Sequence, residues 1–144
     1  MTKPLPPILA VEDDPSDILF IRRALSKVDV ANPLVSVVNG DELEAYLFGR
    51  FPYVDRLLPA LVLLDVGLPR RTGLDLLEWI RKQRDLASLP VVMLSASDKA
   101  KDVNRAYELG ANSYVVKGSG EILGDRLKAL ITYWVKINQP AKGS

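Results

Sequence analysis

The sequence predicts an α/β fold in which helices cover both faces of a five-stranded parallel sheet. Short apolar runs alternate five times with segments of helical periodicity, which is the pattern of consecutive strand–helix–strand units. The runs are nearly continuous in Val, Leu and Ile rather than alternating with polar residues, as expected for strands buried on both faces. The strands are expected at residues 8–11, 34–38, 61–64, 91–94 and 114–116.

The first helix is expected at residues 15–28. Asp14, Pro15 and Asp17 fit the preferences of a helix cap, first helical position and first turn. One stripe of this segment is apolar and should face the sheet, and it consists of Ile18, Ile21, Leu25 and Val28.

Four further helices complete the alternation. The fourth should stop at Gly110, the usual residue after a helix end. These helices are expected at residues 40–47, 73–84, 99–109 and 121–137. The last has a predicted inward stripe of Ile122, Leu123, Leu127, Leu130, Ile131 and Trp134. With 144 residues, of which 48% are apolar, the whole chain, residues 1–144, is expected to form one domain with its core at about residues 8–137.

Composition removes several function classes. The chain has no cysteine and no histidine, which excludes disulfides, thiol nucleophiles and imidazole or thiolate metal sites. Any metal must therefore be held by oxygen. A formal charge of +1 without a basic block argues against nucleic acid as a partner. The residues before the first strand show no signal peptide or membrane span, so a cytoplasmic protein is expected.

Polar side chains follow four of the predicted strands at the point where each strand ends. They are Glu12 and Asp13, Asp65, Ser95, and Lys117. The carboxyl ends of parallel strands meet at one edge of a sheet, where ligands bind. Three carboxylates, a hydroxyl and an ammonium at that edge indicate a site for a divalent cation and a phosphoryl group.

The segments that carry these residues resemble the receiver domain of two-component response regulators, over almost the whole chain. They are residues 8–14, 61–69 with Gly73, 91–96 and 114–117. The resemblance implies a flavodoxin-like, doubly wound sheet in strand order 2-1-3-4-5 with five helices. The link at residues 48–59 and the ending Thr132-Tyr133-Trp134-Val135 are similar to the stand-alone receivers that partner bacterial phytochromes.

Asp65 is the predicted phosphoacceptor, because a carboxylate oxygen can take a phosphoryl group and form a mixed anhydride. The acids repel an incoming phosphate, so a cation must bind first. Mg²⁺, or Mn²⁺, suits an all-oxygen site. By resemblance, Asp13 is the direct ligand, Glu12 acts directly or through water, and the backbone carbonyl of Gly67 supplies another oxygen.

The remaining site residues would contact the phosphoryl group itself. Lys117 would neutralise one phosphoryl oxygen and Ser95 would donate a hydrogen bond to another. Ser95 and Tyr114 are the expected switch residues. Tyr114 fits equally well as a half-buried aromatic residue without a switching role. Ser97 and Asp98 fit helix-capping positions rather than ligands.

The resemblance implies a response regulator that accepts a phosphoryl group from a sensor histidine kinase, with a bacterial phytochrome as the candidate kinase. It would signal by protein contact or phosphorelay, and its only catalysis would be its own phosphorylation and hydrolysis. One alternative is a receiver that binds proteins without phosphorylation. Another is a haloacid-dehalogenase-like phosphatase, but Gly67 stands where that family has a second acid. A flavin protein is disfavoured because Glu12, Asp13 and Asp14 would repel its phosphate.

Two further expectations concern the end of the chain and the loop after the last strand. Beyond the inward Trp134, the residues Tyr133, Val135 and Ile137 extend the apolar stripe of the last helix further than one sheet face needs. They predict a homodimer through the face built by the fourth and fifth helices, with Tyr133, Trp134 and Ile137 as interface residues. A broad core stripe on a terminal helix explains them as well. Receivers usually have a proline after the strand-ending lysine, whereas Gly118 follows Lys117 here, so a cis peptide bond is disfavoured and the loop should be loose.

Overall fold

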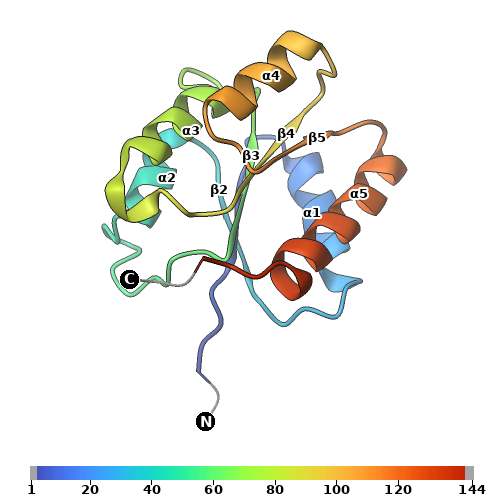
Figure 1. The fold of residues 1–144 in the computed structure, drawn as a ribbon. Coiled ribbons are helices and arrows are strands. Elements are labelled where there is room, and N and C mark those ends of the chain that lie inside the picture. The colour runs from blue at the N-terminus through green and yellow to red at the C-terminus, as the bar shows by residue number, and fades with distance from the viewer. Residues whose placement is uncertain (1–2, 142–144) are drawn as a thin grey trace.

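The computed structural model describes residues 3–141, in which five strands alternate with five α-helices (Figure 1). The strands are β1 (Ile8–Val11), β2 (Leu34–Val37), β3 (Leu61–Asp65), β4 (Val91–Ser95) and β5 (Ser113–Val116). The helices are α1 (Pro15–Ser26), α2 (Gly40–Leu47), α3 (Gly73–Lys82), α4 (Ala100–Glu108) and α5 (Gly120–Thr132). A 3₁₀ turn, η1 (Arg84–Leu86), follows α3, and a π-helical turn, η2 (Tyr133–Ile137), follows α5.

The strands form one parallel sheet in the order β2-β1-β3-β4-β5, which confirms the predicted topology. β1, β3 and β4 are buried along their whole length, as their continuous apolar runs require. The register pairs Asp65 with Leu94 and Ser95 with Val116. The ends of β3, β4 and β5 therefore lie side by side at the carboxyl edge of the sheet.

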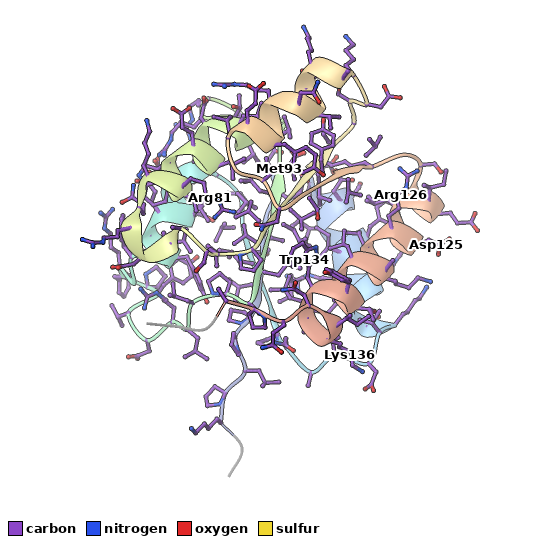
Figure 2. The ribbon with its side chains drawn as sticks, in the orientation of Figure 1. Arg81, Met93, Asp125, Arg126, Trp134 and Lys136 are labelled. Atoms are coloured by element: carbon purple, nitrogen blue, oxygen red, sulfur yellow. The ribbon has the colours of Figure 1, made fainter. Side chains whose placement is uncertain are left out.

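Helices cover both faces of the sheet, with α2, α3 and α4 on one side and α1 and α5 on the other (Figure 1). Successive strand residues point to opposite faces, so Leu9 and Val11 join the core under α2 and α3, whereas Ile8 and Ala10 join the core under α1 and α5. Figure 2 shows Met93 inside the molecule. Within the described residues, no helix has the length and apolar character needed to cross a membrane.

Local sequence signals explain where three of the helices begin. The Asp14 carboxylate accepts a hydrogen bond from the Ser16 amide at 2.8 Å, which confirms its predicted role as the cap of α1. Asn39 caps α2 in the same way. Thr72 and Asp75 form a reciprocal capping box at the start of α3. Each cap satisfies amides that a helix leaves without intrahelical partners.

The end of the last helix differs from the prediction of one α-helix over residues 121–137. The amide of Asn138 donates to the Tyr133 carbonyl at 2.6 Å, the i→i+5 bond of a π turn. The wider turn accommodates one more inward residue, so Val135 packs against the core beside Trp134. Ile122 was wrongly placed in the core stripe: its side chain is 45% exposed, because the buried residues follow the helical spacing from Leu123.

Gly73 fixes the approach of α3 to the end of β3. A Cβ at this position would lie 2.1 Å from the carbonyl oxygen of Asp65. The Gly73 amide also donates to the Val66 carbonyl at 3.0 Å. A side chain here would force α3 away from the backbone that carries the Asp65 carboxylate.

We expect Gly73→Ala to destabilise the protein by about 1–3 kcal/mol, because the methyl group overlaps backbone that has no room to move. Gly124→Ala is the matched control. A Cβ at Gly124 meets nothing within 4 Å, and alanine in a helix interior should stabilise by about 0.5–1 kcal/mol. Urea unfolding of both variants measures the two effects. Equal stabilities would contradict the close approach.

Candidate functional site

Three acids converge at the carboxyl edge of the sheet. Glu12 and Asp13 follow β1, and Asp65 is the last residue of β3. One carboxylate oxygen from each lies within 4.8 Å of the other two. Glu12 and Asp65 are buried, with 2% and 6% of their surface exposed, whereas Asp13 is exposed. Oxygen donors from three carboxylates, open to solvent on the side of Asp13, fit a divalent cation such as Mg²⁺ or Mn²⁺.

Lys117, which follows β5, reaches across the same edge. Its Nζ lies 2.8 Å from Oδ1 of Asp65 and 3.0 Å from Oε2 of Glu12. A third carboxylate, that of Asp17 in the first turn of α1, lies 2.7 Å from Nζ. An ammonium group has three N–H donors, so each donor has a carboxylate acceptor. The lysine side chain is 14% exposed, which strengthens these pairs relative to surface ion pairs.

Burial and neighbouring charge change the proton affinities of this cluster. Burial, and then the charge of Asp65, raise the pKa of Glu12 to about 7, against the opposing effect of Lys117. Burial lowers the pKa of Lys117, but hydrogen bonds to Asp17, Asp65 and Glu12 outweigh it and raise the pKa above its ordinary value. Lys117 is therefore a permanent cation among acids that repel one another.

Ser95 and Tyr114 are connected through Ser97. The buried Ser95 hydroxyl oxygen accepts a hydrogen bond from the Ser97 amide at 3.1 Å. The Tyr114 hydroxyl donates to the Ser97 carbonyl at 2.8 Å. The Ser97 hydroxyl accepts from the amide of Lys99 and donates to Asp102 at 2.5 Å. Lys99, rather than the predicted Ser97 or Asp98, occupies the N-cap position of α4, without a side-chain cap bond. The half-buried Tyr114 thus shares a hydrogen-bonded chain with the end of β4 and the start of α4.

The two glycines singled out in the sequence also border the site. A Cβ at Gly67 would lie 3.6 Å from Oδ2 of Asp65, so Gly67 lies beside the carboxylate; metal binding by its carbonyl oxygen stays a prediction. Gly118 has φ +69°, a conformation that favours glycine. Within residues 3–141 the one cis peptide bond joins Phe51 to Pro52, so the Lys117–Gly118 bond is trans, as expected.

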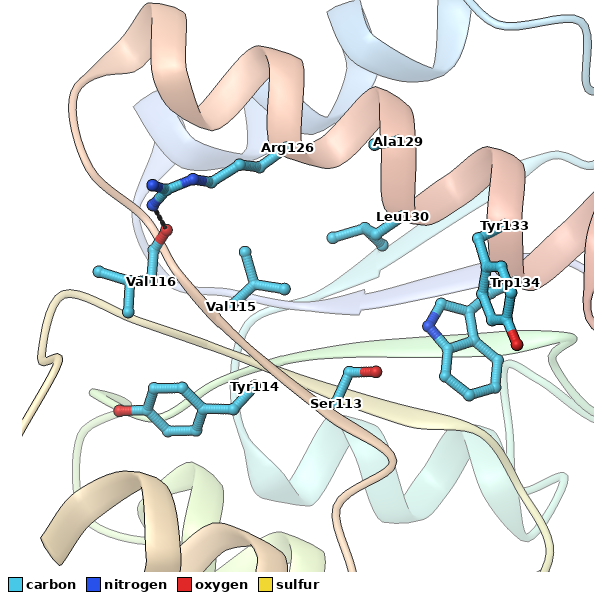
Figure 3. Close-up of a pocket in the computed structure, with 9 residues that line it drawn as sticks. All are labelled: Ser113, Tyr114, Val115, Val116, Arg126, Ala129, Leu130, Tyr133 and Trp134. Carbon is cyan, nitrogen blue, oxygen red and sulfur yellow. Dashed lines mark hydrogen bonds between the residues drawn. The ribbon is translucent and has the colours of Figure 1, made fainter. Parts of the chain in front are cut away.

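The predicted interface residues lie at the far end of β5. Figure 3 shows Tyr133 and Trp134 near Ser113, while Val116, the residue before Lys117, lies at the other end of the strand. They line a groove of about 520 Å³ between β5 and α5. Tyr133 is 46% and Ile137 66% exposed, whereas Trp134 packs partly against the core. Figure 2 shows Lys136, which lies in the π turn η2 between Trp134 and Ile137.

Asp17 is the site residue that the sequence did not reveal. Its place in the first helical turn is explained by the helix dipole alone. The apolar pattern gives no sign that its side chain points back over the carboxyl edge of the sheet. Only the packing of α1 against α5 and the sheet brings its carboxylate to Lys117.

Comparison with known proteins identifies relatives over most of the chain. The family described as "Response regulator receiver domain" matches residues 8–128. Response regulator Rcp1 of Synechocystis sp. is 30% identical over 130 residues, covering 90% of this chain and 88% of Rcp1. The crystal structure of Mn²⁺-bound Rcp1 has a TM-score of 0.88 at 28% identity and covers 96% of this chain and 100% of that one. The phosphorylated cyanobacterial phytochrome response regulator RcpA also has a TM-score of 0.88, at 32% identity, with 95% and 99% covered.

The raised pKa of Glu12 predicts a pH dependence of stability in metal-free solution. The folded protein holds this proton more tightly than the unfolded chain, so stability falls as pH rises from the ordinary value of 4.5 through about 7. Glu12→Gln lacks this titration. We expect the stability of the wild type relative to Glu12→Gln to fall on the order of 3 kcal/mol between pH 4.5 and 8. Urea unfolding with a chelator present tests this. A difference that does not change with pH would contradict it.

Proposed function

The chain belongs to the response regulator receiver family, and from this we propose that it is a stand-alone response regulator that accepts a phosphoryl group on Asp65 from a sensor histidine kinase. The observation that carries the proposal is the arrangement around the Asp65 carboxylate. Lys117 pairs with both Asp65 and Glu12, and Asp13 completes an acidic cluster with these two carboxylates. This is the charge distribution that phosphoryl transfer to a carboxylate requires.

Asp65 provides the nucleophile of the proposed reaction. A carboxylate oxygen of Asp65 forms a bond to phosphorus while the bond from phosphorus to the imidazole nitrogen of the kinase phosphohistidine breaks. Lys117, already 2.8 Å from Asp65, stabilises the negative charge on a phosphoryl oxygen. Ser95, at the end of the neighbouring strand, donates a hydrogen bond to another. Glu12, Asp13 and Asp65 would hold Mg²⁺, which would supply the remaining charge neutralisation.

Two relatives support the metal and the partner. The Rcp1 structure is named for its bound Mn²⁺, and RcpA is named as a phosphorylated phytochrome response regulator. We extend both properties to this chain: a divalent cation site at the acidic cluster, and a bacterial phytochrome as the sensor kinase. The proposal includes a cytoplasmic location, where ATP-dependent kinases act, and no catalysis beyond phosphorylation and hydrolysis of Asp65.

The signal would leave the site through the hydrogen-bonded chain of Ser95, Ser97 and Tyr114. A phosphoryl group adds nearly two negative charges beside Ser95. If Ser95 turns its hydroxyl to a phosphoryl oxygen, the Ser97 backbone and with it the start of α4 must move. Output then passes by protein contact or phosphorelay, through the face of α4, β5 and α5.

The remaining alternative is a receiver that binds partners without being phosphorylated. Family membership decides against the haloacid-dehalogenase-like phosphatase and the flavin protein, which belong to other families. Three charged side chains, those of Glu12, Asp65 and Lys117, are largely removed from water at this site. Burying charges costs free energy, and a protein that only binds partners at another surface gains nothing from it. The arrangement therefore favours phosphorylation over the binding-only alternative.

We expect Asp65→Asn to abolish labelling by acetyl phosphate in Mg²⁺, because an amide oxygen does not form a stable acyl phosphate. The wild type should be labelled, and a chelator should stop the reaction. Asp55→Asn, an exposed acid in the link between α2 and β3, is the control and should label normally. Intact-mass spectrometry measures the added phosphoryl group. Labelling of Asp65→Asn equal to wild type would end the assignment, and a wild type that takes no label would favour the binding-only receiver.

The exposed residues Tyr133 and Ile137 predict a homodimer through the α4–β5–α5 face. Replacing Tyr133 with Glu and Ile137 with Lys should give a folded monomer that still accepts phosphate, because charged residues oppose burial at an interface. Phe51→Glu is the control: Phe51 is 87% exposed and lies outside this face. Sedimentation at high micromolar concentration, with and without acetyl phosphate, gives the oligomeric state. A monomeric wild type in both conditions would contradict the dimer.

A further inference from the structure

Asp17 pairs with Lys117 but has no role in the proposed phosphorylation of Asp65. Asp17 Oδ2 lies 2.7 Å from Lys117 Nζ, the shortest of the three ion pairs of this lysine. The Asp17 side chain is 19% exposed, so the pair is shielded from bulk water. Asp17 is not among the acids whose oxygens converge as a candidate metal site, which are Glu12, Asp13 and Asp65. Its single ionic partner in the described residues is Lys117.

Within the described residues, the ionic partners of the Lys117 ammonium group are Asp17, Glu12 and Asp65 alone. The Lys117 amide donates to the Ser95 carbonyl at 2.8 Å, which fixes the backbone up to this residue. Gly118, with φ +69°, and Gly120 follow within three residues, and glycine gives this loop little local rigidity. The lysine side chain itself has four rotatable bonds, and holding it in one geometry costs conformational entropy. Its position therefore depends on the acids that hold it.

The other two acids change partners during the proposed reaction. Asp65 receives the phosphoryl group, and Glu12 belongs to the cluster that would bind the cation. Both contacts of Lys117 are therefore altered when the site is loaded. The contact between Lys117 and Asp17 stays in place when the cation binds and when Asp65 is phosphorylated. Asp17 also has a rigid base, because the start of α1 is held by the Asp14 cap and by Pro15 in the first turn.

We propose that Asp17 is a positioning residue that holds the Lys117 ammonium group in the cleft, so that it meets the phosphoryl oxygen when Asp65 is attacked. The inference rests on the proposed phosphorylation of Asp65. Asp17 neither touches the phosphoryl group nor binds the cation. It acts through Lys117, by keeping one strong, charge-assisted hydrogen bond throughout the reaction.

A structural explanation exists and has to be separated from this one. An acid in the first turn of a helix stabilises the helix through its dipole. Glu121 lies in the first turn of α5 and is exposed, so Glu121→Gln removes the same kind of charge without touching Lys117. Loss of stability alone would lower the fraction of protein that can be labelled. Loss of positioning lowers the rate at which folded protein is labelled.

The test uses the full chain with acetyl phosphate and Mg²⁺, and follows labelling of Asp65 over time by intact-mass spectrometry. For Asp17→Asn we expect a rate constant about tenfold lower, the effect of weakening one transition-state contact by about 1.4 kcal/mol. The labelled fraction at completion, corrected for hydrolysis, should stay near that of the wild type. Asp17→Glu, which keeps the carboxylate, should restore most of the rate. Glu121→Gln should label at the wild-type rate.

Each outcome decides the question. A rate for Asp17→Asn within twofold of the wild type overturns the positioning role. Equal slowing in Asp17→Asn and Asp17→Glu overturns it too, since the carboxylate would then not be what matters. Slowing in Glu121→Gln as strong as in Asp17→Asn would reduce the effect to general helix electrostatics. A wild type that is not labelled at all defeats the proposed function instead, which keeps the two failures distinguishable.

Discussion

One ammonium group surrounded by three carboxylates is the interaction on which the site depends. Two carboxylates about 4 Å apart repel by roughly 4 kcal/mol at an effective dielectric constant near 20, and Glu12, Asp13, Asp17 and Asp65 share this small region. Lys117 offsets part of that repulsion by donating to three of the four. Burial, and then the charge of Asp65, still raise the pKa of Glu12. The cluster keeps an excess of negative charge, which suits a divalent cation.

The fold holds this charge cluster together through backbone constraints rather than through the charges themselves. Parallel pairing in register brings the ends of β1, β3 and β5 to one edge. The missing side chain of Gly73 lets α3 start against the Asp65 backbone. The ends of β1 and β3 fix Glu12, Asp13 and Asp65, the start of α1 fixes Asp17, and the flexible lysine adapts to them. The backbone thus holds mutually repelling carboxylates close together before any cation or phosphate binds.

Hydrogen bonds of Ser97 connect the carboxyl edge of the sheet to helix α4. Ser97 receives hydrogen bonds from Tyr114 and supplies one to Asp102 of α4, and its amide binds Ser95 inside the site. A change in the direction of one buried hydroxyl therefore disturbs several bonds together. At the opposite end of β5, the π turn directs Tyr133 and Ile137 to solvent and Trp134 inward. The site and the candidate interface thus lie at the two ends of the same strand, β5.

The sequence by itself determined the alternation of strands and helices, the capping role of Asp14, and the convergence of Glu12, Asp13, Asp65, Ser95 and Lys117, because these follow from local periodicity and from the geometry of parallel strands. Only the tertiary structure decided that Asp17 contacts Lys117, that Ser97 joins Ser95 to Tyr114, and that the last turn becomes a π turn with Val135 inside. The contacts of Asp17 with Lys117 and of Tyr114 with Ser97 join residues far apart in the sequence, so they depend on how the helices and loops pack at the edge of the sheet. The Ser95–Ser97 bond and the π turn are local, but apolar periodicity does not encode them.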